Sequence, residues 1–243
     1  MQGPLVELAA GLGYGLWALG IWSDHDLPCA CAVIFVDWDD TILSSTVLTR
    51  TAGLRVDEAS PLDPRLVEEL RALEMDALRF IEECQTRGTM VIVTNAETGW
   101  VQLSGKRFLP RVLDALMKYD VRIMSARSAY EPKYPNSPTE WKQAAFMECV
   151  LAKVESDTEA VAMYGHGTSP LASLNLVSIG DSVSERKAAH FVGTQVEAEI
   201  KVKTVKFVER PDIEKLRRQL MLVTNNLGEI CAHPASFDVN LVC

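Results

Sequence analysis

Several features that would place this chain in other classes of protein are scarce in its sequence. Basic residues are outnumbered: 24 Lys and Arg stand against 33 Asp and Glu in 243 residues, which gives a formal net charge of −9. A domain that binds nucleic acid needs a positively charged surface, so this balance argues against nucleic acid as a partner. The sequence also contains no internal repeat and no low-complexity linker.

Cysteine is present but shows no pattern of pairing or metal binding. The six cysteines stand at positions 29, 31, 84, 149, 231 and 243, without a Cys-x-x-Cys pair, and the 4 histidines are scattered. Cys84 and Cys149 fall among apolar residues of predicted helices, which is typical of reduced, buried thiols. We therefore predict a cytoplasmic protein.

The sequence has no uninterrupted apolar run of the ~20 residues that a membrane-spanning helix needs. The nearest candidate, residues 8–22, is apolar and rich in glycine, but Glu7 lies directly before it and no basic residue precedes it. We interpret residues 1–28 as an apolar segment that packs on the domain as a glycine-spaced helix or loop. Contact with a membrane or a partner is the alternative. The sequence gives no firm membrane signal and does not indicate an oligomeric state.

The most informative segment is a strand that ends in acids. Residues 31–36, Cys-Ala-Val-Ile-Phe-Val, are followed by Asp37 and Asp39. Such an apolar run indicates a buried strand, and in open α/β sheets ligands bind beyond the carboxyl ends of the strands. Neighbouring carboxylates repel unless a cation or a proton lies between them, and Mg²⁺ suits such a site because it binds oxygen ligands and substrate phosphate. Taken alone, an Asp-rich turn explains the segment equally well.

Two further apolar runs also end in polar residues. Residues 91–93 lead into Thr94 and Asn95, whose hydroxyl and amide groups are suited to binding phosphate oxygens. Residues 174–180 lead into Asp181, and Glu185 follows four positions later. If these strands are parallel, their polar ends meet in one crevice.

In this order, the three segments resemble the motifs of the haloacid dehalogenase superfamily, whose phosphatases form a phosphoaspartate intermediate. The resemblance covers roughly residues 30–210. Many members carry Asp where this chain has Glu185. The positions that carry the resemblance are Asp37, Asp39, Thr41, Thr94, Gly180, Asp181 and Glu185.

The superfamily also has a lysine near the start of the helix before its last catalytic strand, and two lysines are candidates here. Ser137 and Glu140 have the spacing of a capping box, and Pro138 stands at the first helical position. Lys142 therefore lies in the opening turns of a helix, whereas Lys133 lies in the loop before it. We favour Lys142, because an anchored helix positions an ammonium group better than a loop does. Lys133 is the alternative.

The resemblance implies a role for each matching residue. Asp37 would be the nucleophile, and Asp39 the general acid and then the general base. Thr94 and the lysine would bind the transferring phosphoryl group, and we expect the amide of Asn95, from its chemistry and position, to bind phosphate as well. Asp37, the backbone carbonyl of Asp39, and Asp181 would hold Mg²⁺, with Glu185 behind these ligands.

Strands that alternate with helices predict an α/β fold, with a doubly wound, parallel, Rossmann-like sheet covered by helices on both faces. We expect one domain over residues 29–232, with a flap at about 42–62, and a C-terminal tail over 233–243. Apolar spacing predicts helices over 64–87, 101–119, 138–154 and 212–230. Short strands are expected over 121–124 and 202–208.

Neither interval that could hold a cap has room for an independent domain, which needs ~50 residues or more. Members of the superfamily without a cap have open sites that suit phosphoproteins or other large substrates. We therefore expect a hydrolase, a Mg²⁺-dependent phosphatase acting on phosphomonoesters of this kind. The alternatives are a small-metabolite phosphatase, a phosphomutase, and a catalytically silent binding module of the same fold.

Overall fold

The computed structural model describes residues 5–9, 32–51, 53, 55–56, 61–164 and 174–242. Within these ranges, a sheet is built from β1 (Leu5–Ala9), β2 (Ala32–Val36), β3 (Gly88–Thr94), β4 (Arg122–Ser125), β5 (Leu174–Gly180), β6 (Ile200–Lys206) and β7 (Phe237–Val242). The order of the strands is β1-β7-β6-β5-β2-β3-β4. All neighbouring strands are parallel. An α/β fold with a parallel sheet is therefore confirmed.

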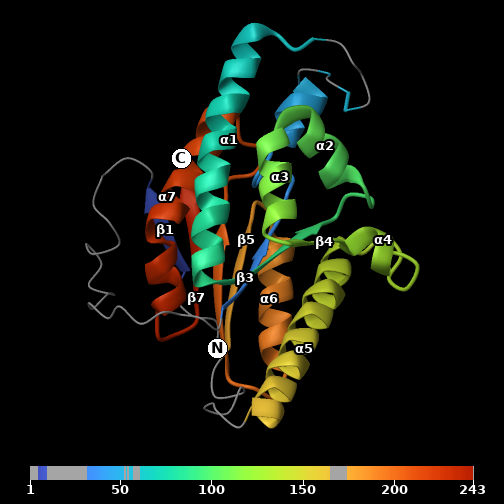
Figure 1. Cartoon of the computed structure of the whole chain (residues 1–243), viewed down its shortest axis with the longest axis vertical. Helices are drawn as coiled ribbons and strands as arrows, with labels where there is room; N and C mark the ends of the chain where they lie inside the picture. The colour runs from blue at the N-terminus through green and yellow to red at the C-terminus, as the bar shows by residue number, and fades with distance from the viewer. Residues whose placement is uncertain are drawn as a thin grey trace.

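Helices connect the strands. They are α1 (Pro64–Arg87), α2 (Trp100–Phe108), α3 (Pro110–Lys118), α4 (Ala126–Tyr130), α5 (Pro138–Tyr164), α6 (Val183–Gln195) and α7 (Ile213–Ala232), with a short π-helical turn at Val47–Thr51. Figure 1 shows α1 and α5 as the long helices of the molecule. The predicted helices over 64–87 and 212–230 are confirmed to within two residues at each end.

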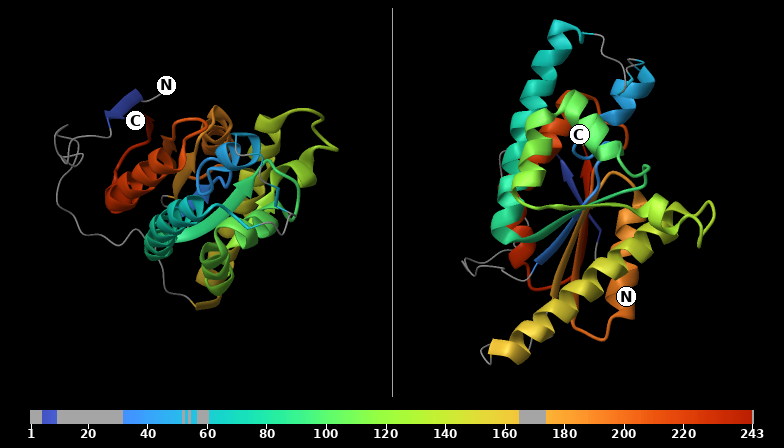
Figure 2. Two further views of the ribbon diagram at one scale, coloured as in Figure 1. Left: turned by 90° about the horizontal axis from the view of Figure 1, so that it is seen from above. Right: turned by 45° about the vertical axis from the view of Figure 1, so that its right-hand side comes forward.

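The sheet has a hydrophobic core on each face. Ile34 and Val36 of β2 contribute to the core beneath α1, α2, α3 and α7. Val33 and Phe35 contribute to the core beneath α4, α5 and α6, where the Phe35 ring stacks on Phe146 at 3.9 Å between centroids. Successive residues of a strand point to opposite faces, so β2 serves both cores. Figure 2 shows the two helix layers on either side of the sheet.

Two predicted helices differ in extent from those observed. The single helix expected over 101–119 is wrong, because it is divided into α2 and α3 at Leu109, whose φ and ψ are −137° and 60°. Pro110 follows, and a proline disfavours the helical conformation in the residue before it. The helix expected over 138–154 begins at Pro138 as predicted but continues to Tyr164.

The C-terminal residues differ from the prediction. The tail expected over 233–243 instead forms β7 over Phe237–Val242, and Val239 and Leu241 are buried in the core beneath α7. On its outer side β7 pairs with β1, in register from Leu5 opposite Asp238 to Ala9 opposite Val242. Figure 1 shows β1 beside β7 and α7. Residues 10–28 of the apolar N-terminal segment lie outside the described ranges.

No large cap interrupts the described residues. The interval between β2 and β3 holds the π-helical turn and α1, and the interval between β4 and α5 holds α4 and a short turn. Residues 52, 54 and 57–60 of the expected flap are outside the described ranges. Within those ranges, no helix combines the length and apolar character needed to span a membrane.

Candidate active site

The candidate site lies at the carboxyl ends of β2, β3 and β5, the three adjacent strands at the centre of the sheet. From β2 the chain proceeds to β3 and β4 on one side, and it later returns to β5 on the other side. Ligands in open α/β sheets bind where the strand order reverses in this way. Asp37 stands directly after β2, and its backbone N–H donates to the carbonyl of Ile179 in β5 at 3.0 Å. Thr94 ends β3, and Asp181 follows β5.

A tight loop after β2 turns Asp39 back toward β3. The carbonyl of Trp38 accepts hydrogen bonds from the N–H groups of Ile42 at 3.0 Å and Leu43 at 3.1 Å. Asp40 adopts a left-handed conformation with φ of 53°, which Asp tolerates better than most residues. The hydroxyl of Thr41 is buried and has no hydrogen-bond partner among the described residues.

The side chain of Lys142, from α5, contacts the carboxylate of Asp37. Its Nζ lies 3.0 Å from Oδ2 of Asp37 and also forms an ion pair with Glu185 of α6. The lysine is only 1% exposed. Burial alone would lower the pKa of Lys142, but the carboxylates of Asp37 and Glu185 raise it above its ordinary value. The ammonium group of Lys133, in contrast, lies over the ring of Tyr134 at 5.1 Å from its centroid. The structure thus brings Lys142, and not Lys133, to Asp37.

Glu185 is held in a capping box at the start of α6. Its carboxylate accepts hydrogen bonds from the backbone N–H of Ser182 at 3.1 Å and from the Ser182 hydroxyl at 2.6 Å. A Cβ atom added to Gly180 would lie 2.4 Å from Cγ of Glu185. Glycine before Asp181 therefore provides the space in which the longer glutamate side chain folds back to Lys142.

Negative charge exceeds positive charge in this cluster. Burial raises the pKa of Asp37 well above its ordinary value, Lys142 lowers it, and Glu185, Asp39 and Asp181 raise it further. Burial also raises the pKa of Asp181 to about 7, and the charge of Glu185 adds to that shift. Lys142 offsets part of this negative charge, and its effect on the pKa of Asp37 is opposite in direction to that of the neighbouring carboxylates.

Asp39 is held at both of its carboxylate oxygens. The Thr94 hydroxyl donates to Oδ2 at 3.1 Å, and the indole N–H of Trp100 donates to Oδ1 at 2.8 Å. Oγ1 of Thr94 in turn accepts from the backbone N–H of Ala96 at 2.9 Å. Trp100 was not predicted as a site residue, because no motif or spacing in the sequence connects it with Asp39.

Asn95 lies at the same sheet edge, but its side chain turns to α5. Its Nδ2 donates to the carbonyl of Pro138 at 3.4 Å, while its buried Oδ1 accepts no hydrogen bond from the described residues. Asn95 therefore connects the end of β3 to the start of the helix that carries Lys142. A phosphate-binding role for Asn95 stays a prediction.

The donors present at the sheet edge are compatible with Mg²⁺. Within the described ranges, no cluster of three or more His, Cys, Asp or Glu side chains is arranged to hold a metal ion. Mg²⁺ requires less, because it binds through one or two carboxylates and keeps water and substrate phosphate as its other ligands. Asp37 and Asp181 are two carboxylates at this edge of the sheet, and the charge of Asp181 contributes to raising the pKa of Asp37.

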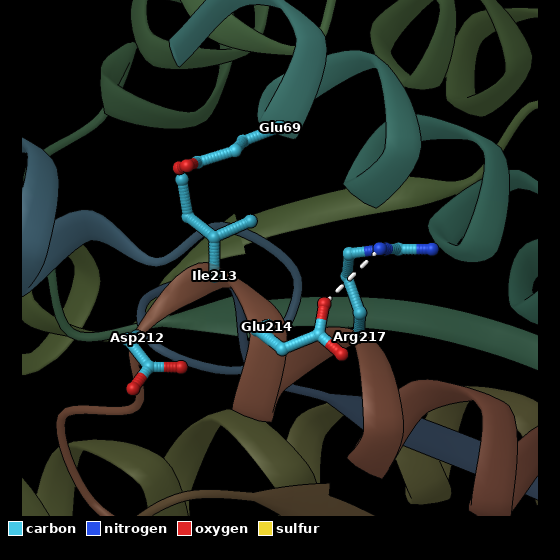
Figure 3. A pocket seen from close by; sticks show the side chains of 5 residues that line it. All are labelled: Glu69, Asp212, Ile213, Glu214 and Arg217. Atoms are coloured by element: carbon cyan, nitrogen blue, oxygen red, sulfur yellow. Dashed lines mark hydrogen bonds and ion pairs between the residues drawn. The ribbon is translucent and has the colours of Figure 1, made fainter. Parts of the chain in front are cut away.

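A separate cavity of about 260 Å³ lies between α1 and the start of α7, and its lining is Glu69, Asp212, Ile213, Glu214 and Arg217. Figure 3 shows that the Arg217 guanidinium faces Glu214, with which it forms an ion pair at 3.2 Å. None of the residues predicted from the sequence to form the site lines this cavity. Arg217 therefore offsets part of the negative charge of the acidic side chains that line the cavity.

Comparisons of the chain with protein-family models, with curated proteins and with solved structures give no significant match.

Proposed function

We propose that this protein is a Mg²⁺-dependent phosphatase of the haloacid dehalogenase type, which hydrolyses phosphomonoesters through a phosphoaspartate. The observation that carries the proposal is the buried contact between Lys142 and Asp37 at the point where the strand order reverses. This contact joins Asp37, at the end of β2, to Lys142, on α5, and these two residues match the acid and the lysine of the superfamily motifs. Asp39, Thr94 and Asp181 surround the same point.

In the first step, an oxygen of Asp37 attacks the phosphorus atom of the substrate. The new bond between Asp37 and phosphorus forms as the bond from phosphorus to the leaving oxygen breaks, and Asp39 gives its proton to that oxygen. Lys142 holds positive charge beside the nucleophile, which favours approach of the anionic phosphoryl group and offsets the charge that develops on its oxygens.

In the second step, a water molecule attacks the phosphorus atom of the phosphoaspartate. Asp39 accepts a proton from that water, the bond between phosphorus and Asp37 breaks, and inorganic phosphate is released. The two steps return Asp37 and Asp39 to their starting forms. We assign binding of a phosphoryl oxygen in both steps to the Thr94 hydroxyl, which lies 3.1 Å from Oδ2 of Asp39.

Asp37, Asp181 and the backbone carbonyl of Asp39 would hold Mg²⁺ at this site. When bound, the ion supplies positive charge that neutralises phosphoryl oxygens and favours the ionised form of its carboxylate ligands. We do not assign Glu185 as a metal ligand, because its carboxylate contacts Lys142 and Ser182. It keeps Lys142 in place.

The short connections around the site favour a large substrate. Only residues 126–137 separate β4 from α5, and α4 occupies part of that interval. With no large cap among the described residues to enclose a small molecule, we propose a phosphoprotein or another large phosphomonoester as the substrate. Comparison of hydrolysis rates for phosphopeptides and for sugar phosphates tests this part of the proposal.

Activity itself is tested with purified protein and 4-nitrophenyl phosphate. We expect release of nitrophenolate in the presence of Mg²⁺, no release with excess chelator, and no detectable turnover by Asp37→Asn. The matched control is Asp114→Asn, because Asp114 is an exposed carboxylate on α3. Equal activity in Asp37→Asn and the wild type would exclude Asp37 as the nucleophile.

A further inference from the structure

We propose that Trp100 is a positioning residue that orients Asp39 for proton transfer to the leaving group. This inference rests on the proposed phosphatase function and extends it to a residue outside the motifs. The observation is the hydrogen bond of 2.8 Å from Nε1 of Trp100 to Oδ1 of Asp39. Trp100 is the first residue of α2 and lies 61 positions after Asp39 in the sequence.

The chemistry of the indole group assigns different roles to the two oxygens of Asp39. An indole N–H is only a donor, so Oδ1 must accept from Trp100 and does not carry the transferable proton. The hydroxyl of Thr94 donates to Oδ2 at 3.1 Å in this structure, but a hydroxyl group can also accept and is therefore compatible with a proton on Oδ2. Oδ2 is therefore the oxygen that exchanges a proton with the substrate. Without the bond to Trp100, the carboxyl group can rotate and its two oxygens become equivalent.

A second set of hydrogen bonds links Trp100 to the loop that carries the acids. The indole N–H of Trp38, between Asp37 and Asp39 in sequence, donates to Oγ of Ser104 at 2.9 Å. The Ser104 hydroxyl donates to the backbone carbonyl of Trp100 at 2.7 Å. Trp38 is completely buried. The loop and α2 are thus joined twice, through Trp38 with Ser104 and through Asp39 with Trp100.

The turn before Trp100 is also anchored. Gly99 has φ of 92°, a left-handed value that favours glycine, and it places Trp100 at the start of α2. The carbonyl of Ala96 accepts from the Ser125 hydroxyl at 2.6 Å, and the N–H of Thr98 donates to Oγ of Ser128 at 3.0 Å. These bonds fix the turn against α4, so the indole approaches Asp39 from a rigid support, as a positioning residue requires.

The inference predicts a specific dependence on the leaving group. A good leaving group such as 4-nitrophenolate departs with little help from a general acid, whereas phenolate benefits more from protonation. Trp100→Phe keeps an aromatic ring but removes the N–H donor. We expect this variant to lose ~10-fold or more in kcat/KM for phenyl phosphate beyond its loss for 4-nitrophenyl phosphate, because a wrongly oriented general acid protonates the poor leaving group less well.

The test measures kcat and KM for a series of substituted phenyl phosphates. Asp39→Asn is the reference for a complete loss of the general acid, and Trp100→Phe in the Asp39→Asn background should cause no further selective loss. Trp141→Phe is the matched control, because its indole donates at 2.7 Å to the backbone carbonyl of Tyr134 and not to Asp39. It should leave the ratio between phenyl and nitrophenyl substrates unchanged.

Equal losses on good and poor leaving groups in Trp100→Phe would show that Trp100 has a structural role alone, and would overturn the inference. If thermal denaturation shows that Trp100→Phe is unfolded, Ser104→Ala is the second variant, with the same selective loss expected at smaller size. An unchanged ratio in folded Ser104→Ala then overturns the inference. Absence of activity in the wild type on every phosphate ester is a different result, because it overturns the proposed function itself.

Discussion

The ammonium group of Lys142 lies 3.0 Å from Oδ2 of Asp37, and the two side chains come from segments that are more than 100 residues apart in the sequence. Glu185 completes the cluster from α6. All three side chains are buried, so their charges interact with little screening by solvent. This cluster joins the strand β2 to the helices α5 and α6 and makes the candidate site part of the structural core.

Replacement of Lys142 should therefore affect both stability and activity. Lys142→Met leaves Asp37 and Glu185 buried without their cation, and loss of one member of a buried ion pair typically costs ~3–5 kcal/mol. We expect a decrease of this order in the free energy of unfolding, measured by urea denaturation, together with loss of phosphatase activity. Lys133→Met is the control and should change neither quantity appreciably. A similar cost for both variants would contradict the assignment.

Gly180 and Glu185 should show strong coupling in a double-mutant cycle. The methyl group of Gly180→Ala would collide with Cγ of Glu185, 2.4 Å away, and displace the carboxylate from Lys142. We expect Gly180→Ala to lower the free energy of unfolding by ~1–3 kcal/mol, the usual cost of overpacking. In a Glu185→Ala background the same substitution should cost much less. If the losses of unfolding free energy in Gly180→Ala and Glu185→Ala simply add in the double variant, the added methyl group does not act through Glu185.

Binding of Mg²⁺ should stabilise the folded protein independently of catalysis. A ligand that binds only the native state adds ~2.7 kcal/mol at a concentration 100 times its Kd, so the melting temperature should rise with Mg²⁺ concentration. Asp181→Asn should remove most of this rise, whereas Asp114→Asn should retain it. The measurement is thermal denaturation over a Mg²⁺ titration. An equal rise in Asp181→Asn would exclude Asp181 as a metal ligand.

The acid stability of the protein should depend on Asp238 of β7. Burial tends to raise the pKa of Asp238, but hydrogen bonds from His190 and Thr204, with the charge of Arg186, lower it below its ordinary value. The unfolded state then binds the proton more tightly than the native state. The stabilisation is complete above the unfolded pKa of ~3.9 and is lost as the pH falls through the lower native value.

Asp238→Asn should therefore flatten the dependence of unfolding free energy on pH below about pH 4, while Asp114→Asn should not. Urea denaturation at a series of acidic pH values measures this dependence. An unchanged slope in Asp238→Asn would show that other carboxylates dominate the acid transition. Because Asp238 lies in β7, the result also reports on the attachment of this strand to α6.

The parts of the site that come from local sequence patterns were predictable. The apolar runs before Asp37, Thr94 and Asp181 indicated buried strands, and parallel strands direct their carboxyl ends to one edge of a sheet. The position of Lys142 followed from the predicted start of its helix at Pro138. Local patterns succeeded where the side chain is positioned by the end of its own strand or helix.

Other features depended on contacts between distant segments. The bond between Trp100 and Asp39 joins residues 61 positions apart and has no sequence signature. The break at Leu109 could have been read from Pro110, but the apolar spacing on both sides favoured one helix. Strand β7 was missed although its residues 237–242 alternate in part, because a short alternating run at a terminus is weak evidence without a known partner strand.

The partner of β7 is β1, and this pairing has a consequence for the synthesis of the protein. Leu5 is translated long before Asp238, the residue it faces in the sheet. On the ribosome, the inner strands can assemble before β7 has been made, and the hydrogen bonds between β1 and β7 form only after β7 emerges. We expect the β1–β7 seam to be the last part of the sheet to form in the cell.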